Sequence, residues 1–127
     1  MVALRPYESK AIRAVTGATI RPGGLELTRR TAAYCGLKAG DRVLDVGCGT
    51  GATVAFLNRQ MGIRAIGVDV SAKLLAEARS KAPNLSVMRA NGVALPVRSA
   101  AVGAVYCECV LSLISDTMAA LVECRRV

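Results

Sequence analysis

A glycine-rich turn that follows a carboxylate is the part of the sequence best suited to binding a small ligand. After an apolar run, Asp45 precedes three alternate glycines, Gly47, Gly49 and Gly51. Glycines at a strand-to-helix turn accept left-handed backbone angles and let a ligand touch the backbone. Dinucleotide-binding turns have the spacing G-x-G-x-x-G, whereas this turn is G-x-G-x-G with an acid before it. The carboxylate disfavours a pyrophosphate and favours a ligand with cationic groups.

A second acid, Asp69, ends the next apolar run, over residues 64–69. It follows the glycines by about 20 residues, the spacing at which the second strand of a nucleotide-binding unit reaches a ribose. We expect Asp69 to accept hydrogen bonds from both hydroxyls of a ligand ribose.

Residues 45–51 and 67–71 together resemble the first two motifs of the class I S-adenosylmethionine-dependent methyltransferases. The resemblance implies S-adenosylmethionine as cofactor, whose sulfonium and ammonium groups suit the charge of Asp45. An ordinary βαβ turn with a surface Asp is the alternative interpretation. Cofactor contacts are expected from the two motifs at Asp45, Gly47, Cys48, Gly49, Gly51, Asp69 and Val70.

Residues 90–97 resemble the family segment in which an acid followed by a small residue contacts adenine. Here Asn91 replaces the usual Asp, so a carbonyl acceptor for the adenine amino group remains but the charge is lost. The backbone N–H of Gly92 can donate to the adenine ring. An Asx turn at a strand end is the alternative interpretation of Asn91.

Glu108 follows the fourth predicted strand, at the edge where open α/β sheets bind ligands. A carboxylate there can lie beside the sulfonium or orient the methyl acceptor, so Glu108 is a candidate for cofactor binding and catalysis. A solvent-exposed Glu is the alternative interpretation. Arg21 can reach the methionine carboxylate, although packing or exposure would also explain it.

Other acid–base and metal chemistry has little support in the sequence. The chain contains no His, so the available bases besides Glu108 are the other acids and Tyr7. This shortage of bases favours an acceptor that is intrinsically nucleophilic. Cys107 and Cys109 would need two further ligands to hold a metal, and none is suitably placed, so we expect no metal site.

Strands alternating with helices indicate an α/β fold: a Rossmann-like, doubly wound parallel sheet in three α/β/α layers, incomplete after the fourth strand. We expect an N-terminal helix and loop over residues 1–23 and the cofactor-binding domain over 24–127. The predicted helices cover about 6–16, 25–35, the stretch from the glycine turn to 61, 72–82 and 117 onward, and the predicted strands cover 43–46, 64–69, 85–89 and 102–107.

The amino-acid composition argues against nucleic-acid and membrane partners. The net charge is +8, but the basic residues are dispersed and aromatic residues make up only 3% of the chain, so a nucleic-acid partner is not favoured. Neither a membrane-length apolar run nor a signal-peptide pattern is present, and the five cysteines are an odd number. We expect a cytoplasmic protein with reduced thiols and no membrane partner.

The predicted function is transfer of a methyl group from S-adenosylmethionine to an unidentified small-molecule acceptor. The alternatives are a non-catalytic S-adenosylmethionine-binding fragment, an RNA methyltransferase and, least favoured, a nicotinamide dehydrogenase. Because the resembled family continues with further strands, we expect this chain to turn over poorly. We also expect it to form a homodimer or aggregate through the open edge of the strand at 102–107.

Overall fold

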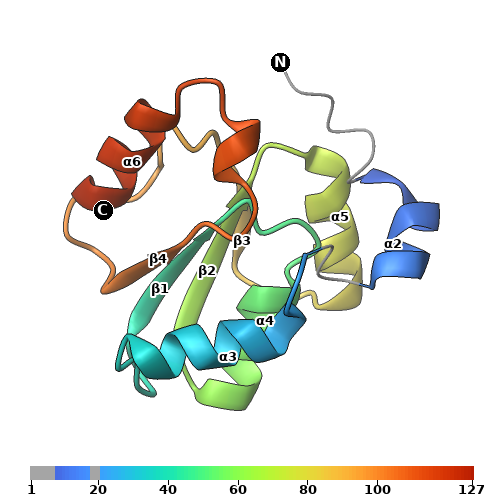
Figure 1. Cartoon of the computed structure of the whole chain (residues 1–127), viewed down its shortest axis with the longest axis horizontal. Helices are drawn as coiled ribbons and strands as arrows, with labels where there is room; N and C mark the ends of the chain where they lie inside the picture. The colour runs from blue at the N-terminus through green and yellow to red at the C-terminus, as the bar shows by residue number, and fades with distance from the viewer. Residues whose placement is uncertain (1–7, 18–20) are drawn as a thin grey trace.

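The structure is a computed structural model that describes residues 8–17 and 21–127. Its centre is a parallel four-stranded sheet with the order β3-β2-β1-β4 (Figure 1). This confirms the predicted parallel α/β fold, in which the fourth strand lies at an open edge. The strands are β1 (Arg42–Val46), β2 (Arg64–Asp69), β3 (Val87–Arg89) and β4 (Ala104–Tyr106).

Strands β3 and β4 are shorter than the predicted ranges 85–89 and 102–107. The N–H of Leu85 donates to Ala82 at the end of the preceding helix, so this residue belongs to the turn. The N–H groups of Ala101 and Val102 both donate to the carbonyl of Val127, which replaces a strand partner there. Local hydrogen bonds therefore use the backbone groups that a longer ladder would need.

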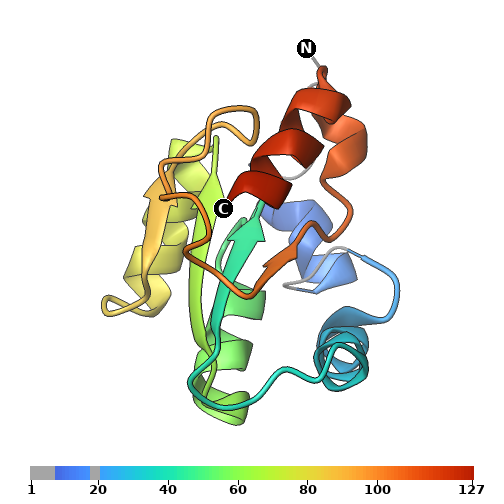
Figure 2. The same ribbon diagram turned by 90° about the vertical axis from the view of Figure 1, so that its left-hand side faces the viewer.

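Helices cover both faces of the sheet and give the expected three layers (Figures 1 and 2). Helices α3 (Gly24–Tyr34), α4 (Ala52–Met61) and α5 (Ala72–Lys81) pack on one face, where Val54, Leu57 and Leu75 are fully buried. Helix α6 (Thr117–Arg126) packs on the other face. A short 3-10 helix, η1 (Leu111–Leu113), connects β4 to α6.

The predicted helix ends are confirmed where a side chain or a glycine specifies them. The Ser71 hydroxyl accepts the N–H of Leu74 at the start of α5, and the Asp116 carboxylate accepts that of Ala119 at the start of α6. Gly36 ends α3 with φ +68°, which side chains with a Cβ rarely adopt.

Helices α6 and α2 both expose apolar side chains. The α6 apolar side chains Met118, Leu121 and Val122 are exposed, whereas Ala120 is buried and Cys124 packs against the core. Both sets recur at helical spacing, so periodicity alone cannot tell which one faces the sheet.

Helix α2 (Lys10–Thr16) packs through a charged residue. Arg13 is only 9% exposed and contacts Glu77 of α5 at 2.5 Å, while the apolar side chain of Val15 is 88% exposed. An ion pair therefore docks α2. Tyr7, which the sequence placed on this helix as a possible base, lies outside the described residues.

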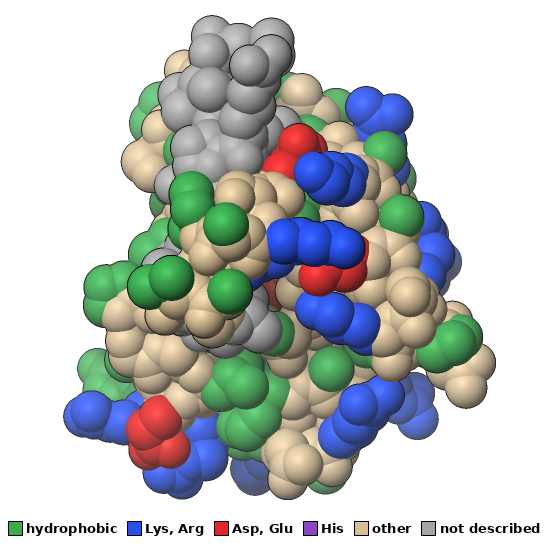
Figure 3. All heavy atoms as spheres, turned by 90° about the vertical axis from the view of Figure 1, so that its right-hand side faces the viewer, with side chains coloured by type: hydrophobic (Ala, Val, Ile, Leu, Met, Phe, Trp, Pro, Cys, Tyr) green, Lys and Arg blue, Asp and Glu red, His purple; other side chains and the backbone are tan. Residues whose placement is uncertain are grey.

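Charged groups are dispersed over the surface viewed in Figure 3, where acidic side chains lie among the Lys and Arg side chains. Glu77 illustrates this, because it pairs with both Arg13 and Lys81. Of the helices in the described part of the chain, none has both the length and the apolar character needed to cross a membrane.

A polar clasp attaches α6 to the loop before β4. Glu123 accepts the N–H of Leu95 at 2.7 Å, and Arg126 donates to Glu123 and to the carbonyls of Leu95 and Val97. The Arg126 guanidinium and the Leu95 N–H lower the pKa of Glu123 from 4.5 to about 2. The clasp therefore holds the loop between β3 and β4 against α6.

Acid should weaken this clasp. Because the folded-state pKa of Glu123 is depressed, its stabilising effect is present above about pH 4.5 and is lost as the pH falls toward about 2. We expect Glu123→Gln to have a lower melting temperature than wild type at neutral pH and a melting temperature close to it near pH 2. Thermal unfolding followed by circular dichroism would measure both. A constant difference across this range would contradict the pKa assignment.

Candidate functional site

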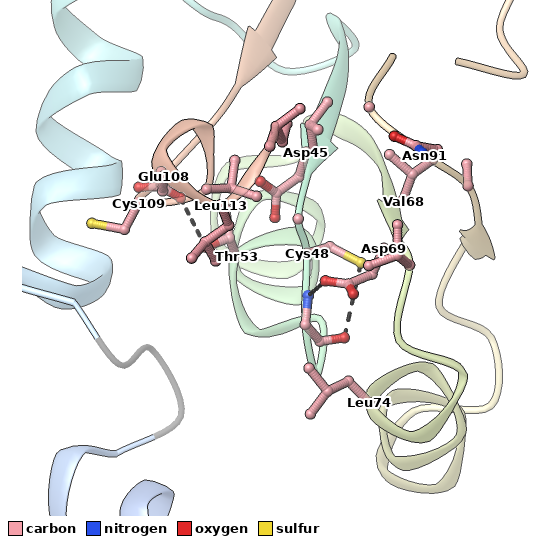
Figure 4. A pocket seen from close by; sticks show the side chains of 18 of the residues that line it. Asp45, Cys48, Thr53, Val68, Asp69, Leu74, Asn91, Glu108, Cys109 and Leu113 are labelled. Atoms are coloured by element: carbon pink, nitrogen blue, oxygen red, sulfur yellow. Dashed lines mark hydrogen bonds between the residues drawn. The ribbon is translucent and has the colours of Figure 1, made fainter. Parts of the chain in front are cut away.

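A cavity of about 690 Å³ opens at the carboxyl ends of β1, β2 and β4. Figure 4 shows Glu108 and Thr53 on one side of it, Asp45 between the sides, and Asp69 and Asn91 on the other. The structure brings nine of the ten residues predicted to contact the cofactor into its lining. These nine are Asp45, Gly47, Cys48, Gly49, Asp69, Val70, Asn91, Gly92 and Glu108.

The three glycines of the turn serve different purposes. Gly49 has φ +54°, and a Cβ built on it meets no protein atom within 4 Å, so its open side faces the cavity. A Cβ on Gly47 would clash with Val110. Gly51 is absent from the cavity lining, and a Cβ there would clash with Leu85. Gly51 is therefore a packing residue that starts α4 in a left-handed conformation.

Gly49→Val is expected to abolish ligand binding in the cavity while the protein still folds. A branched side chain would fill the space beside the turn and also resist the positive φ. Calorimetric titration with S-adenosylhomocysteine would measure the loss.

Gly36→Val is the matched control, because Gly36 also has a positive φ and no neighbour within 4 Å but does not line the cavity. It should be destabilised yet bind normally. Equal affinity in the two variants would show that Gly49 does not face a ligand.

Asp69 supports the glycine turn from β2. One of its carboxylate oxygens accepts the N–H of Gly49 at 2.8 Å, and the other accepts the N–H of Ser71 at 2.8 Å. A carboxylate oxygen has two acceptor sites, so each can accept one further hydrogen bond from the cavity. Asp69 is thus placed to hold the turn and a pair of ligand hydroxyls together.

A polar cluster of Arg21, Thr28, Thr53 and Glu108 lies at the opposite wall, where all but Thr28 line the cavity. Arg21 lies 2.8 Å from Glu108, and the hydroxyls of Thr28 and Thr53 donate to the Glu108 carboxylate at 2.8 and 3.1 Å. The Glu108 side chain is 17% exposed and that of Arg21 only 7%, so the solvent-exposed interpretation of both residues is wrong. The Nε of Arg21 is buried and has no hydrogen-bond partner among the described residues.

Sequence reasoning missed Thr28 and Thr53. Thr28 is fully buried on α3 and also accepts a hydrogen bond from Arg21. Thr53 lies in the first turn of α4, with 6% of its surface exposed. The available signal was a polar residue on the inward face of each helix, since a buried hydroxyl needs a partner.

Asp45 lies on the same face of β1 as Val43, beside the polar cluster, and is 3% exposed. Burial raises its pKa well above the usual value of 3.8, and the carboxylate of Glu108 raises it further, while Arg21 acts in the opposite direction. The negative charge that the sequence predicted for Asp45 is therefore disfavoured while the cavity holds no ligand. A cationic ligand would favour ionisation.

The wall near Asn91 is largely apolar. The side-chain oxygen of Asn91 accepts the N–H of Val93 at 3.2 Å, so the Asx-turn interpretation of this side chain is correct. A Cβ on Gly92 would lie 3.0 Å from the Cδ1 of Ile114, so the two residues are closely packed. Four apolar side chains, missed by sequence reasoning, also line the cavity: Val93, Val110, Leu113 and Ile114. Figure 4 shows Leu113 on the side of Glu108.

The thiols near the cavity form no metal site among the described residues. Cys48 is buried, and burial raises the pKa of its thiol. Its side chain packs on Gly67, where a built Cβ would lie 2.6 Å from the Cys48 Cβ. Cys48 therefore contributes its backbone to the turn and its side chain to the core.

A family model described as "Methyltransferase domain" matches residues 43–127. The O-methyltransferase resE of Aspergillus sclerotiorum is 31% identical over 107 residues, which are 80% of this chain and 40% of that protein. The chain thus spans less than half the length of this curated relative.

Two solved structures have a similar fold. The [4+2]-cyclase SpnF is 30% identical, with a TM-score of 0.72 over 80% of this chain and 40% of that one. A phosphoethanolamine N-methyltransferase 2 of Haemonchus contortus, solved with phosphomonomethylethanolamine and S-adenosylhomocysteine, is 23% identical. Its TM-score is 0.79, over 98% of this chain and 33% of that one.

Proposed function

Because this chain belongs to the class I S-adenosylmethionine-dependent methyltransferases, we propose that its cavity binds S-adenosylmethionine and that the protein methylates a small-molecule acceptor. One observation carries the proposal. A single carboxylate, Asp69, is bonded to the glycine turn and lies across the same cavity from a buried polar cluster. The cavity thus offers acceptors for a ribose and a separate wall for a charged amino-acid group.

The residues fit the three parts of the cofactor. We assign the ribose hydroxyls to Asp69 and the adenine to the apolar wall beside Gly92. We assign the amino-acid end to the polar cluster, where the Arg21 guanidinium can attract a carboxylate and Glu108 can attract an ammonium. The sulfonium would then be held near Asp45. Val70 completes the lining on the ribose side.

The cofactor supplies a methyl group that is already activated by the sulfonium charge. The protein residues therefore chiefly hold the reactants in line and exclude water. Glu108 binds Arg21, Thr28 and Thr53 at once, which supports a positioning role. A proton-accepting role for Glu108 would require it to leave these partners. We accordingly favour an acceptor that is nucleophilic without a protein base.

Formation of S-adenosylhomocysteine by the full-length protein tests this function. We expect it to accumulate only when a small amine or thiol acceptor is present, and S-adenosylmethionine should raise the melting temperature while NAD should not. The likeness to a [4+2]-cyclase favours one second candidate, a cofactor-binding protein that transfers no methyl group. Cofactor binding without turnover on a broad acceptor panel would support that candidate and contradict ours.

A further inference from the structure

Two thiols from different elements meet in the core between the sheet and α6. The sulfur atoms of Cys107, which directly follows β4, and Cys124, in α6, lie 3.7 Å apart. Both are partly buried and pack against the core cluster that includes Leu44, Val46 and Val68. The other thiols are separate from this pair, since Cys35 and Cys109 are exposed and Cys48 is buried on the far side of the sheet.

The two sulfurs are in van der Waals contact and are not bonded. A disulfide has its sulfurs about 2.05 Å apart, so an approach of roughly 1.7 Å would join them. Rotation of the two side chains, together with any backbone movement that the bond geometry still requires, would supply this approach. A covalent link between α6 and the end of β4 is therefore within reach of the native fold.

We expect the segment after β4 to move, and Glu108 within it would then shift relative to Arg21, Thr28 and Thr53. Helix α6 is held by the clasp of Glu123 and Arg126 and by the carbonyl of Val127, which binds the N–H groups of Ala101 and Val102. By contrast, the residues after Cys107 include Cys109 in a strained conformation with φ +55°. Glu108 lies between these two cysteines and would be displaced with them.

We propose that Cys107 and Cys124 are a reversible modification site that forms an intramolecular disulfide with a low-molecular-weight disulfide. One cysteine thiolate attacks the reagent R–S–S–R, forms a mixed disulfide and releases RS⁻. The other cysteine thiolate then displaces the second RS⁻, so two electrons pass from the cysteines to the reagent. The two protons lost by the cysteine thiols are taken up by the two RS⁻, which gives two R–SH.

The reaction should be slow at neutral pH. Burial and the neighbouring Cys124 raise the pKa of Cys107 to about 12, so little of its thiolate is present. The link should form faster as the pH rises toward that value, and a reducing agent should reverse it.

Oxidised glutathione and digestion with a protease that cuts after Glu provide the test. Cleavage after Glu108 and Glu123 separates Cys107, Cys109 and Cys124 into three peptides, which mass spectrometry can distinguish. We expect the peptides of Cys107 and Cys124 to be joined in a variant that carries both Cys35→Ser and Cys109→Ser. Cys124→Ser should abolish the link. Unlinked, alkylatable Cys107 and Cys124, or a Cys109–Cys124 link in wild type, would overturn the proposal.

Cofactor affinity is a second measurement, which tests whether the disulfide affects the cavity. It rests on the proposed function. Because Glu108 would move, oxidised wild type should bind S-adenosylhomocysteine at least about fivefold more weakly than reduced wild type. Cys124→Ser should bind equally under both conditions. A link that forms without changing the affinity would overturn the coupling to Glu108. If neither redox form binds the cofactor, the proposed function is wrong. The modification site is tested separately, by the peptide analysis.

Discussion

Asp69→Ala is expected to lower the affinity for S-adenosylhomocysteine by at least about a hundredfold. The variant loses two charge-assisted hydrogen bonds to the ribose, each worth roughly 1.5–3 kcal/mol. It also frees the N–H of Gly49, which the Asp69 carboxylate now binds at 2.8 Å, so the turn is no longer held in position. Isothermal titration calorimetry measures both the affinity and the stoichiometry.

Asp41→Ala controls for the loss of a carboxylate that caps the backbone. Asp41 accepts the N–H of Lys38 at 2.7 Å but lies before β1, away from the cavity. This variant should retain wild-type affinity. Wild-type affinity in folded Asp69→Ala would contradict the ribose assignment.

Asp45→Asn is expected to stabilise the free protein and weaken its binding of S-adenosylmethionine. The raised pKa of Asp45 means that the folded state keeps a proton that the unfolded state releases, so stability falls as the pH rises above about 3.8. Asn has nearly the same shape and cannot ionise. Its melting temperature should exceed that of wild type by several degrees at neutral pH, and this gain should vanish in acid below the unfolded-state pKa.

The two ligands separate the charge of Asp45 from its shape. S-adenosylmethionine carries a sulfonium that favours the ionised carboxyl, whereas S-adenosylhomocysteine does not. We expect Asp45→Asn to cost S-adenosylmethionine about tenfold in affinity, or about 1.4 kcal/mol, and S-adenosylhomocysteine less. Wild-type affinity for S-adenosylmethionine should also rise with pH. A variant that loses stability and weakens both ligands equally would show that Asp45 acts through packing.

The sequence predicted those site residues whose type is set by the local backbone, such as a positive φ or a strand end. Gly47 and Gly49 occupy backbone conformations that favour glycine, and Asp69 follows from its position at the end of β2. Ser71 and Asp116 were predictable as caps for the same reason, since the N-terminal N–H groups of a helix need an acceptor nearby.

The polar cluster could not be predicted because its members come from four separate segments. Arg21 precedes α3, Thr28 lies within it, Thr53 begins α4 and Glu108 follows β4. Only the packing of α3 and α4 on one face of the sheet brings them together. The same limit explains Gly51, whose contact with Leu85 depends on how the loop before β3 folds back.

The crystal structure of the protein with S-adenosylhomocysteine tests the central claim most directly. The account predicts that the ribose hydroxyls lie within hydrogen-bond distance of the Asp69 carboxylate and that adenine lies beside Gly92. It further predicts that the amino-acid group contacts Arg21 and Glu108. A ligand bound outside this cavity, or one whose ribose makes no contact with Asp69, would contradict it.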